Sequence, residues 1–161
     1  MTRILGIDPG LNGAIAVLNG DHLTLIDMPT VTVDRNGKSK RQVSATELAE
    51  IIKKFTPLEM TTPIAFCEKV GAVSGQGVTS VFSFGRSFGM IEGILATLQI
   101  PTTFVAPATW TKGVGRSPGK DASRVRAMEL FPAHQIMFSR VKDDGRADAA
   151  LIAYWGQKNY G

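Results

Sequence analysis

The chain has 161 residues, of which 43% are hydrophobic and 20% are charged, and this composition excludes an intrinsically disordered protein. Its net charge of +4 is compatible with a nucleic-acid partner but is too small to require one. The chain has one cysteine and no run of about eighteen apolar residues, which excludes an internal disulfide and predicts no membrane span.

The first part of the chain predicts three antiparallel strands. Residues 3–8 are apolar and read as a buried strand, and a turn rich in glycine and proline separates them from a second strand at residues 14–18. Asn19-Gly20 is a strong hairpin signal and leads into a third strand at residues 23–28. We therefore expect a meander of three strands at the start of the fold.

The rest of the chain alternates between helices and strands. Ser44, with Glu47 three residues later, forms a capping box that begins a helix. The later elements that we expect are a strand at 64–68, a helix at 78–98, a strand at 102–105, and helices at 121–131 and 143–160. This order predicts an α/β fold, with a mixed five-stranded sheet (three antiparallel strands, then parallel strands) and helices on both faces.

Positive charge is concentrated in two segments. One is the polar, glycine-containing stretch at residues 29–43, where we expect a mobile loop, and the other lies at residues 112–126. The candidate DNA-binding residues in these segments are Arg35, Lys38, Lys40, Arg41, Lys112, Arg116 and Lys120. The sequence leaves open the alternative that both segments are solvated polar surfaces.

Four carboxylates are the main candidates for chemistry. Asp8 and Glu68 each end an apolar strand, and a carboxylate buried there needs a positive partner. Asp144 and Asp148 are four residues apart and share one face of the last expected helix, where small and apolar residues surround Asp148. We interpret Asp143 as an exposed residue of the first helical turn. Oxygen ligands of this kind suit Mg²⁺ or Mn²⁺.

These carboxylates predict hydrolysis of a phosphodiester with two metal ions. Two Mg²⁺ ions, for which Mn²⁺ could substitute, would lie about 3.5–4 Å apart and act on the attacking water and the leaving oxygen. Asp8 would bridge both ions, while Glu68 and the aspartate pair would each hold one. Lys120, near the start of a helix, would contact the scissile phosphate. The alternative for Lys120 is a solvated surface lysine.

Four segments resemble the RuvC family of Holliday-junction resolvases, which has a ribonuclease-H-like fold. Residues 6–10, Gly-Ile-Asp-Pro-Gly, match the first motif of that family, and residues 66–70 look like its second. Residues 84–89 are similar to a helix segment at the family's dimer interface, and residues 147–153 resemble its last motif. The resemblance extends over nearly the whole chain, with the motifs in the right order.

The resemblance implies a single RuvC-like nuclease domain over residues 1–161. Such a protein would be a crossover junction endodeoxyribonuclease of DNA recombination and repair, a magnesium-dependent homodimer that nicks four-way junctions symmetrically. We expect it to be cytoplasmic, in a bacterial or phage-infected cell, because the N-terminus also lacks a signal-peptide pattern. The resemblance places Asp8, Glu68 and Asp148 at metal positions, and Lys112 and Lys120 near the scissile phosphate.

The chain departs from the family pattern at two places. Gly145 stands where the family usually has its third metal ligand, so Asp144 would have to substitute for it. Gly71, Ala72 and Val73 stand where bacterial relatives carry an aromatic residue that stacks into the junction, which implies a different preference among branched substrates.

Three other functions fit part of the sequence. Residues 8–13 also fit the phosphate loop of an actin-type or sugar-kinase-type ATP-binding module, although the chain is too short for the two domains of such proteins. A non-catalytic protein that binds branched DNA would gain by losing the carboxylates near phosphates. A nuclease acting on RNA or RNA–DNA hybrids stays open, because recognition of a 2′-hydroxyl depends on local geometry.

Overall fold

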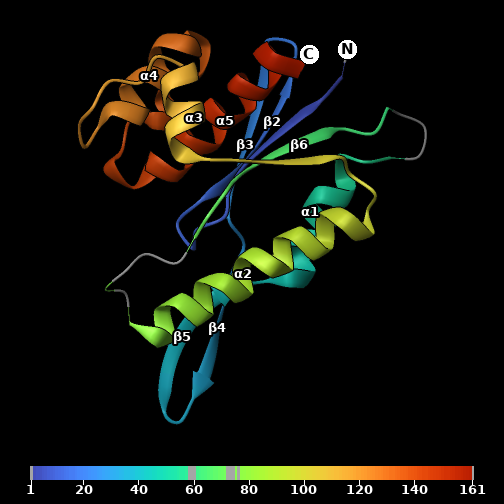
Figure 1. The fold of residues 1–161 in the computed structure, drawn as a ribbon, viewed down its shortest axis with the longest axis vertical. Coiled ribbons are helices and arrows are strands. Elements are labelled where there is room, and N and C mark those ends of the chain that lie inside the picture. The colour runs from blue at the N-terminus through green and yellow to red at the C-terminus, as the bar shows by residue number, and fades with distance from the viewer. Residues whose placement is uncertain (1, 58–60, 72–74, 76, 161) are drawn as a thin grey trace.

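The protein is built around one five-stranded sheet with helices on both faces, and a second, two-stranded sheet projects from it (Figure 1). The structure is a computed structural model that describes residues 2–57, 61–71, 75 and 77–160. No helix in this described part is long and apolar enough to cross a lipid bilayer.

The central sheet has the strand order β3-β2-β1-β6-β7. Its strands are β1 (Ile4–Asp8), β2 (Ala14–Asn19), β3 (His22–Asp27), β6 (Ile64–Glu68) and β7 (Thr102–Val105). The first three strands are antiparallel, while β1, β6 and β7 run parallel, so the predicted mixed sheet is confirmed. Because Ile7 pairs with Cys67 in this register, the next residues of the two strands, Asp8 and Glu68, lie at the same edge of the sheet.

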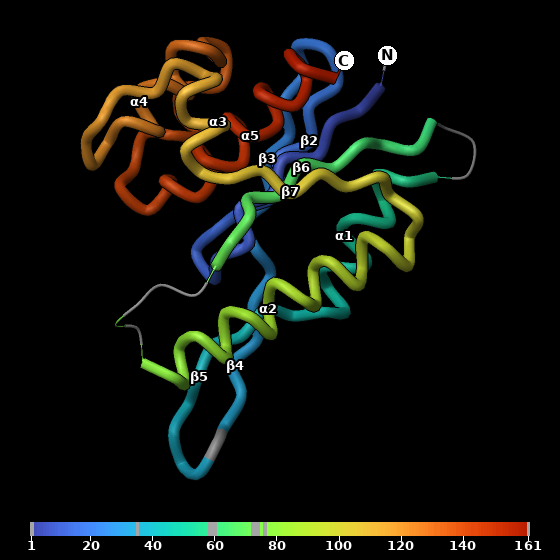
Figure 2. The backbone as a smooth tube through the Cα atoms, in the orientation of Figure 1, coloured from blue at the N-terminus to red at the C-terminus, as the bar shows by residue number. Residues whose placement is uncertain are grey.

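Each face of the sheet carries its own helices (Figure 2). One face is covered by α1 (Ala45–Lys54) and α2 (Val78–Thr97). The other is covered by α3 (Pro107–Gly113), α4 (Ala122–Leu130) and α5 (Asp144–Tyr160), with 3₁₀ helices at Pro132–Phe138 and Val141–Asp143. The alternation of side chains along β1 divides the core, since Ile4 packs towards α5 whereas Leu5 and Ile7 pack towards α1 and α2.

Helix α5 packs directly on β1 because that strand has a glycine at the point of contact. A Cβ atom on Gly6 would lie 2.2 Å from the carbonyl oxygen of Ala149, so no other residue fits there without moving the helix. The adjacent residue of α5 is Asp148, and the same close contact therefore brings its carboxylate to the carboxyl end of β1.

Residues 30–43 form a β-hairpin, so the prediction of a mobile loop was wrong for this segment. Strands β4 (Thr30–Arg35) and β5 (Lys38–Val43) pair along their whole length and extend away from the central sheet (Figure 1). Asn36 and Gly37 connect them with φ angles of 54° and 72°, the left-handed conformation that a type I′ turn requires. Asn36-Gly37 is the same turn signal that correctly predicted the first hairpin at Asn19-Gly20.

Candidate active site

Carboxylates from three separate elements meet at one edge of the sheet. Asp8 ends β1, Glu68 ends β6, and Asp148 lies in the second turn of α5. Each of Asp8 and Glu68 feels the negative charge of Asp148, and Asp8 also feels that of Glu68. The structure thus brings together three of the four carboxylates that the sequence singles out.

Asp8 lies at the centre of this cluster. Its pKa is raised to about 7, chiefly by burial and also by the charges of Asp148 and Glu68, while the hydrogen bond from the backbone of Gly10 opposes the rise. The Gly10 N–H donates to Oδ1 of Asp8 over 3.1 Å. The turn folds tightly behind the carboxylate, because a Cβ atom on Gly13 would lie 2.2 Å from the carbonyl oxygen of Asp8.

Glu68 is held by a tryptophan that the sequence analysis missed. Burial raises the pKa of Glu68, and the hydrogen bond from Trp110 counteracts this by stabilising the ionised form. The indole Nε1–H of Trp110, in α3, donates to Oε2 of Glu68 over 2.8 Å, and the tryptophan is only 2% exposed. A buried indole N–H usually has a hydrogen-bond acceptor, so Trp110 could have been expected to bind a polar group. Nothing in the sequence identified Glu68 as that group.

Asp148 has one oxygen that lacks a partner. Burial raises its pKa, and a hydrogen bond from the Ser123 hydroxyl and the charge of Arg116 oppose this rise. Its other oxygen, Oδ1, is buried and accepts no hydrogen bond from the described residues. A buried carboxylate oxygen without a partner is costly, and a cation or a donor at this position would remove the cost.

Arg116 belongs to the carboxylate cluster, although the sequence analysis assigned it to an outlying DNA-binding surface. Its positive charge lowers the pKa of both Glu68 and Asp148, and its Nε donates to the Ser123 hydroxyl over 2.7 Å. Arg116 therefore offsets part of the negative charge of the cluster and orients the hydroxyl that binds Asp148.

The other predicted DNA-binding lysines lie on the surface. Lys112 is exposed in the last turn of α3, and Lys120 is exposed just before α4. Lys38 and Lys40 are exposed on β5. The structure thus places these lysines on the surface, and no hydrogen bond or ion pair among the described residues joins them to the three carboxylates.

Asp144 is not turned into the cluster in the way the sequence predicts. Its Oδ1 accepts from the Nε of Arg124 over 2.8 Å, and its side chain is 45% exposed, so it forms an ion pair at the rim. Its charge still raises the pKa of Asp148. Position 145 offers no substitute, because a Cβ atom on Gly145 would lie 2.1 Å from the carbonyl oxygen of Asn12.

The interpretation of Asp143 as an exposed helix-start residue was wrong. Asp143 is 1% exposed and ends the 3₁₀ helix that precedes α5. Burial alone would raise its pKa, but hydrogen bonds from the side chain and the backbone N–H of Arg140 lower it. Asp143 therefore anchors the segment before α5.

The two neighbouring aspartates should respond differently to neutralisation. We expect Asp143→Asn to lower the free energy of unfolding by about 1–3 kcal/mol, because it weakens hydrogen bonds to a buried carboxylate. Asp144→Asn should change it by less than about 1 kcal/mol, since Asp144 is half exposed and Arg124 keeps its ion pair with Asp121. Urea unfolding of both variants measures this difference, and an equal effect would place the two side chains in similar surroundings.

The donor set at this edge fits a hard divalent cation. Three partly buried carboxylates whose pKa values are all raised gain from a positive charge, and Oδ1 of Asp148 accepts no hydrogen bond from the described residues and could accept a cation. However, the described residues contain no group of three His, Cys, Asp or Glu side chains already arranged to hold a metal ion. Binding would therefore require small side-chain adjustments.

Replacing Trp110 by phenylalanine tests whether the indole hydrogen bond positions Glu68. Trp110→Phe keeps most of the packing and removes only the donor, so we expect any Mn²⁺ affinity of the site to fall about 10- to 100-fold, as for other partners of metal ligands. The matched control is Trp155→Phe, since Trp155 packs edge-on against Phe66. Titrating both variants with Mn²⁺ should show weaker metal binding in Trp110→Phe alone, and unchanged binding would contradict the positioning role.

Comparisons with known proteins identify the fold. No protein-family model matches the chain. A stretch of 77 residues, 48% of this chain but only 8% of the other, is 39% identical to the chloroplastic Holliday junction resolvase MOC1 of Chlamydomonas reinhardtii. The structure of Thermus thermophilus RuvC in complex with a Holliday junction substrate superposes with a TM-score of 0.64 at 12% identity, covering 98% of this chain and 96% of that one. A second T. thermophilus RuvC structure gives a TM-score of 0.54 at the same identity and coverage. The chain therefore has the RuvC-type fold, with the ribonuclease-H-like sheet order that its motifs predict.

Proposed function

We propose that this protein is a metal-dependent endonuclease that cuts branched DNA, with four-way junctions as its main substrate. The observation that carries this proposal is the cluster of Asp8, Glu68 and Asp148, three partly buried carboxylates with raised pKa values, of which one buried oxygen lacks any partner among the described residues. A RuvC-type fold, seen in a neighbour bound to a Holliday junction, supports the choice of substrate.

Asp8, Glu68 and Asp148 would hold Mg²⁺, with two ions per site and Mn²⁺ as a substitute. When bound, these ions supply a polarised phosphodiester and a water activated for attack. Asp144 would join as a fourth ligand only if it left its ion pair with Arg124. The hydrogen bond from Trp110 would keep Glu68 ionised and oriented for metal binding.

The basic residues around the cluster would bind the sugar-phosphate backbone. Contacts from lysine and arginine to phosphates provide most of the affinity for DNA and orient it without reading its sequence. In the sequence, Lys112 and Lys120 lie on either side of Arg116, and we assign these two lysines to the scissile strand. The hairpin residues Arg35, Lys38, Lys40 and Arg41 would bind DNA phosphates next to the scissile strand.

A homodimer would provide the second site that symmetric nicking needs. Gly85, Gly89 and Gly93 recur every four residues along α2 and so share one face of the helix. All three are exposed, and a Cβ atom on any of them would meet no atom of the described residues within 4 Å. This bare stripe would allow the same helix of a second copy to approach closely.

Lys120 should contribute to the rate of cleavage more than to binding. We expect Lys120→Ala to lower the single-turnover rate on a four-way junction about 100-fold, because a cation near the scissile phosphate acts on the charge that develops during the reaction. Lys142→Ala is the control, since Lys142 is also exposed but lies in the 3₁₀ helix before α5. A similar loss of rate in both variants would mean that Lys120 contributes only through the overall positive charge of the protein.

The choice of substrate can be tested by offering several labelled nucleic acids side by side. We expect the wild-type protein with Mg²⁺ to make paired, symmetric nicks in a four-way junction and to leave linear duplex intact. Equal cutting of flaps and junctions would indicate a general nuclease for branched DNA. Preferential cutting of an RNA–DNA hybrid would contradict the proposal, as would tight junction binding with no cleavage.

A further inference from the structure

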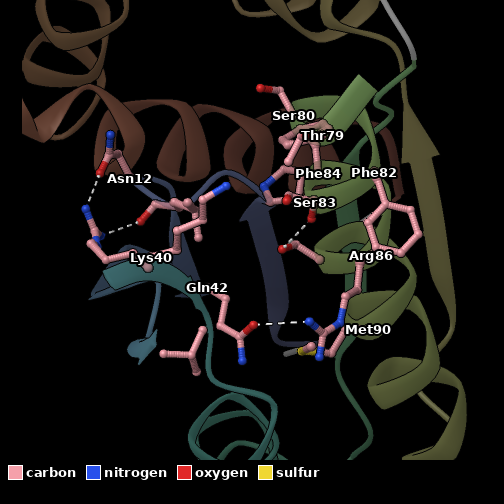
Figure 3. A pocket seen from close by; sticks show the side chains of 15 residues that line it. Asn12, Lys40, Gln42, Thr79, Ser80, Phe82, Ser83, Phe84, Arg86 and Met90 are labelled. Atoms are coloured by element: carbon pink, nitrogen blue, oxygen red, sulfur yellow. Dashed lines mark hydrogen bonds between the residues drawn. The ribbon is translucent and has the colours of Figure 1, made fainter. Parts of the chain in front are cut away.

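A groove runs between the β4–β5 hairpin and the first half of α2 (Figure 3). Its volume is about 430 Å³, which is within the range of pockets that hold a ligand of nucleotide size and is far too small for a duplex. Pro9 and Asn12, from the turn that follows Asp8, form part of its wall. The groove therefore begins next to the carboxylate cluster.

The groove carries positive charge that no carboxylate in its wall neutralises. Lys40, Arg41 and Arg86 line it, and none of its lining residues is acidic. By contrast, four arginines of the opposite layer form ion pairs with carboxylates, namely Arg124, Arg126, Arg140 and Arg146. An excess of positive charge in a concave wall favours an anionic ligand.

Neutral oxygens hold the two arginines in place without cancelling their charge. The Nη1 of Arg86 donates to the amide oxygen of Gln42 over 3.1 Å, as Figure 3 shows. Arg41 donates to the side-chain oxygen of Asn12 over 3.1 Å and to the carbonyl oxygen of Leu11 over 3.0 Å. Because both side chains are already ordered, an incoming phosphate would lose little entropy in binding to them.

The same groove offers apolar surface next to its cations. Leu11, Phe82 and Met90 contribute to its lining, and Phe82 is 68% exposed although it is a large aromatic residue. Grooves that combine positive charge with exposed aromatic side chains bind single-stranded nucleic acid, in which the bases are free to contact apolar surface. Paired bases in a duplex have no such free faces.

We propose that this groove binds an unpaired DNA strand and leads it to the carboxylate edge. The inference rests on the proposed nuclease function. It names the part of a branched substrate that the groove binds, which is the strand left unpaired at the branch point. Phosphates would contact Lys40 and Arg86, and bases would lie against Phe82. None of the α2 glycines assigned above to a dimer lines the groove, but Phe84, Arg86 and Ser87 of the segment that resembles a dimer interface do, so the oligomeric state is measured beside binding.

The test compares charge removal inside the groove with charge removal elsewhere. We would measure binding of a labelled oligothymidine and of a blunt duplex, without Mg²⁺, by fluorescence anisotropy over a range of salt. The groove variant is Lys40→Gln/Arg86→Gln, and the control is Lys53→Gln/Lys54→Gln, two exposed lysines in the last turn of α1. Phe82→Ala is compared with Val78→Ala, which removes another exposed apolar side chain of α2 outside the groove.

Two lost phosphate contacts should lower the salt slope for oligothymidine by about 1.4 and the affinity at about 0.1 M salt roughly 25-fold. Duplex binding should fall less than oligothymidine binding. The Lys53→Gln/Lys54→Gln control should keep its affinity for both ligands. Phe82→Ala should weaken oligothymidine binding more than Val78→Ala. Lys40→Gln alone, on the exposed face of β5, gives a second reading if the double variant is unstable, with a slope change of about 0.7.

Unchanged oligothymidine binding in Lys40→Gln and in the double variant would overturn the inference. If the groove variants lost a dimer that the wild-type protein forms in sedimentation, while their oligothymidine affinity per chain stayed unchanged, the inference would also be overturned. The groove would then hold a second copy of the chain. Failure of the proposed function gives a different result, since the wild-type protein would then leave the junction uncut whatever the groove variants bind.

Discussion

Asp8→Asn should abolish Mg²⁺-dependent cleavage of a four-way junction while leaving junction binding intact or stronger. Asp8 is the carboxylate of the cluster whose pKa is raised by the charges of both Glu68 and Asp148. Removing its charge removes the ligand best placed to contact both metal ions. A loss of several kcal/mol of transition-state stabilisation corresponds to a fall in rate of at least about a thousandfold.

Binding should respond in the opposite direction to catalysis. A carboxylate beside the DNA backbone repels phosphates, so its loss does not weaken the complex. The control is Asp21→Asn, in the exposed turn between β2 and β3. Single-turnover cleavage and Mg²⁺-free junction binding of both variants provide the two readings. Retained cleavage in Asp8→Asn would remove Asp8 from the metal site.

The metal-free protein should lose stability as the pH rises from about 4 to about 7. Burial raises the pKa of Asp8 from 3.8 to about 7, so between these values the folded state binds more protons than the unfolded state. The free energy of unfolding then falls with rising pH, by up to about 4 kcal/mol from Asp8 alone. Glu68 and Asp148 act in the same direction, because burial raises their pKa values too.

Mg²⁺ should reverse this trend, because it binds the ionised carboxylates and stabilises the folded state by mass action. The measurement is thermal unfolding in chelator and in Mg²⁺ across this pH range. Asp8→Asn should be more stable than wild type near neutral pH in chelator, and it should show a smaller pH dependence and a weaker response to Mg²⁺. A metal-free wild-type protein that becomes more stable between pH 4 and 7 would contradict the burial of an unneutralised carboxylate cluster.

The sequence was sufficient for features that depend on local pattern. Asp8 and Glu68 end short apolar strands, and parallel pairing of β1 with β6 then brings them to one edge, as the ribonuclease-H-like order implies. Asp148 was identified from its small apolar neighbours, which reflect the close packing of α5 on Gly6. These residues could be predicted because strand ends and helix faces follow from periodicity.

The partners of these carboxylates could not be predicted in the same way. Trp110, Arg116 and Ser123 come from α3, the segment after it, and α4, and their meeting with Glu68 and Asp148 depends on how these pieces pack on the sheet. The misinterpretation of Asp143 has a similar cause, since its burial depends on the turn made by Arg140. The missed hairpin differs, because the charged residues of β4 and β5 hid the Asn36-Gly37 signal.

The measurement that tests the central claim most directly is Mn²⁺ binding to the purified protein, detected by electron paramagnetic resonance. The proteins compared are the wild type and the variants Asp8→Asn, Glu68→Gln and Asp148→Asn. The account predicts two ions bound per wild-type chain, competed by Mg²⁺, with binding lost or strongly weakened in each of the three variants and retained in Asp21→Asn. Binding that persists unchanged in the three variants would contradict a metal centre at this edge of the sheet.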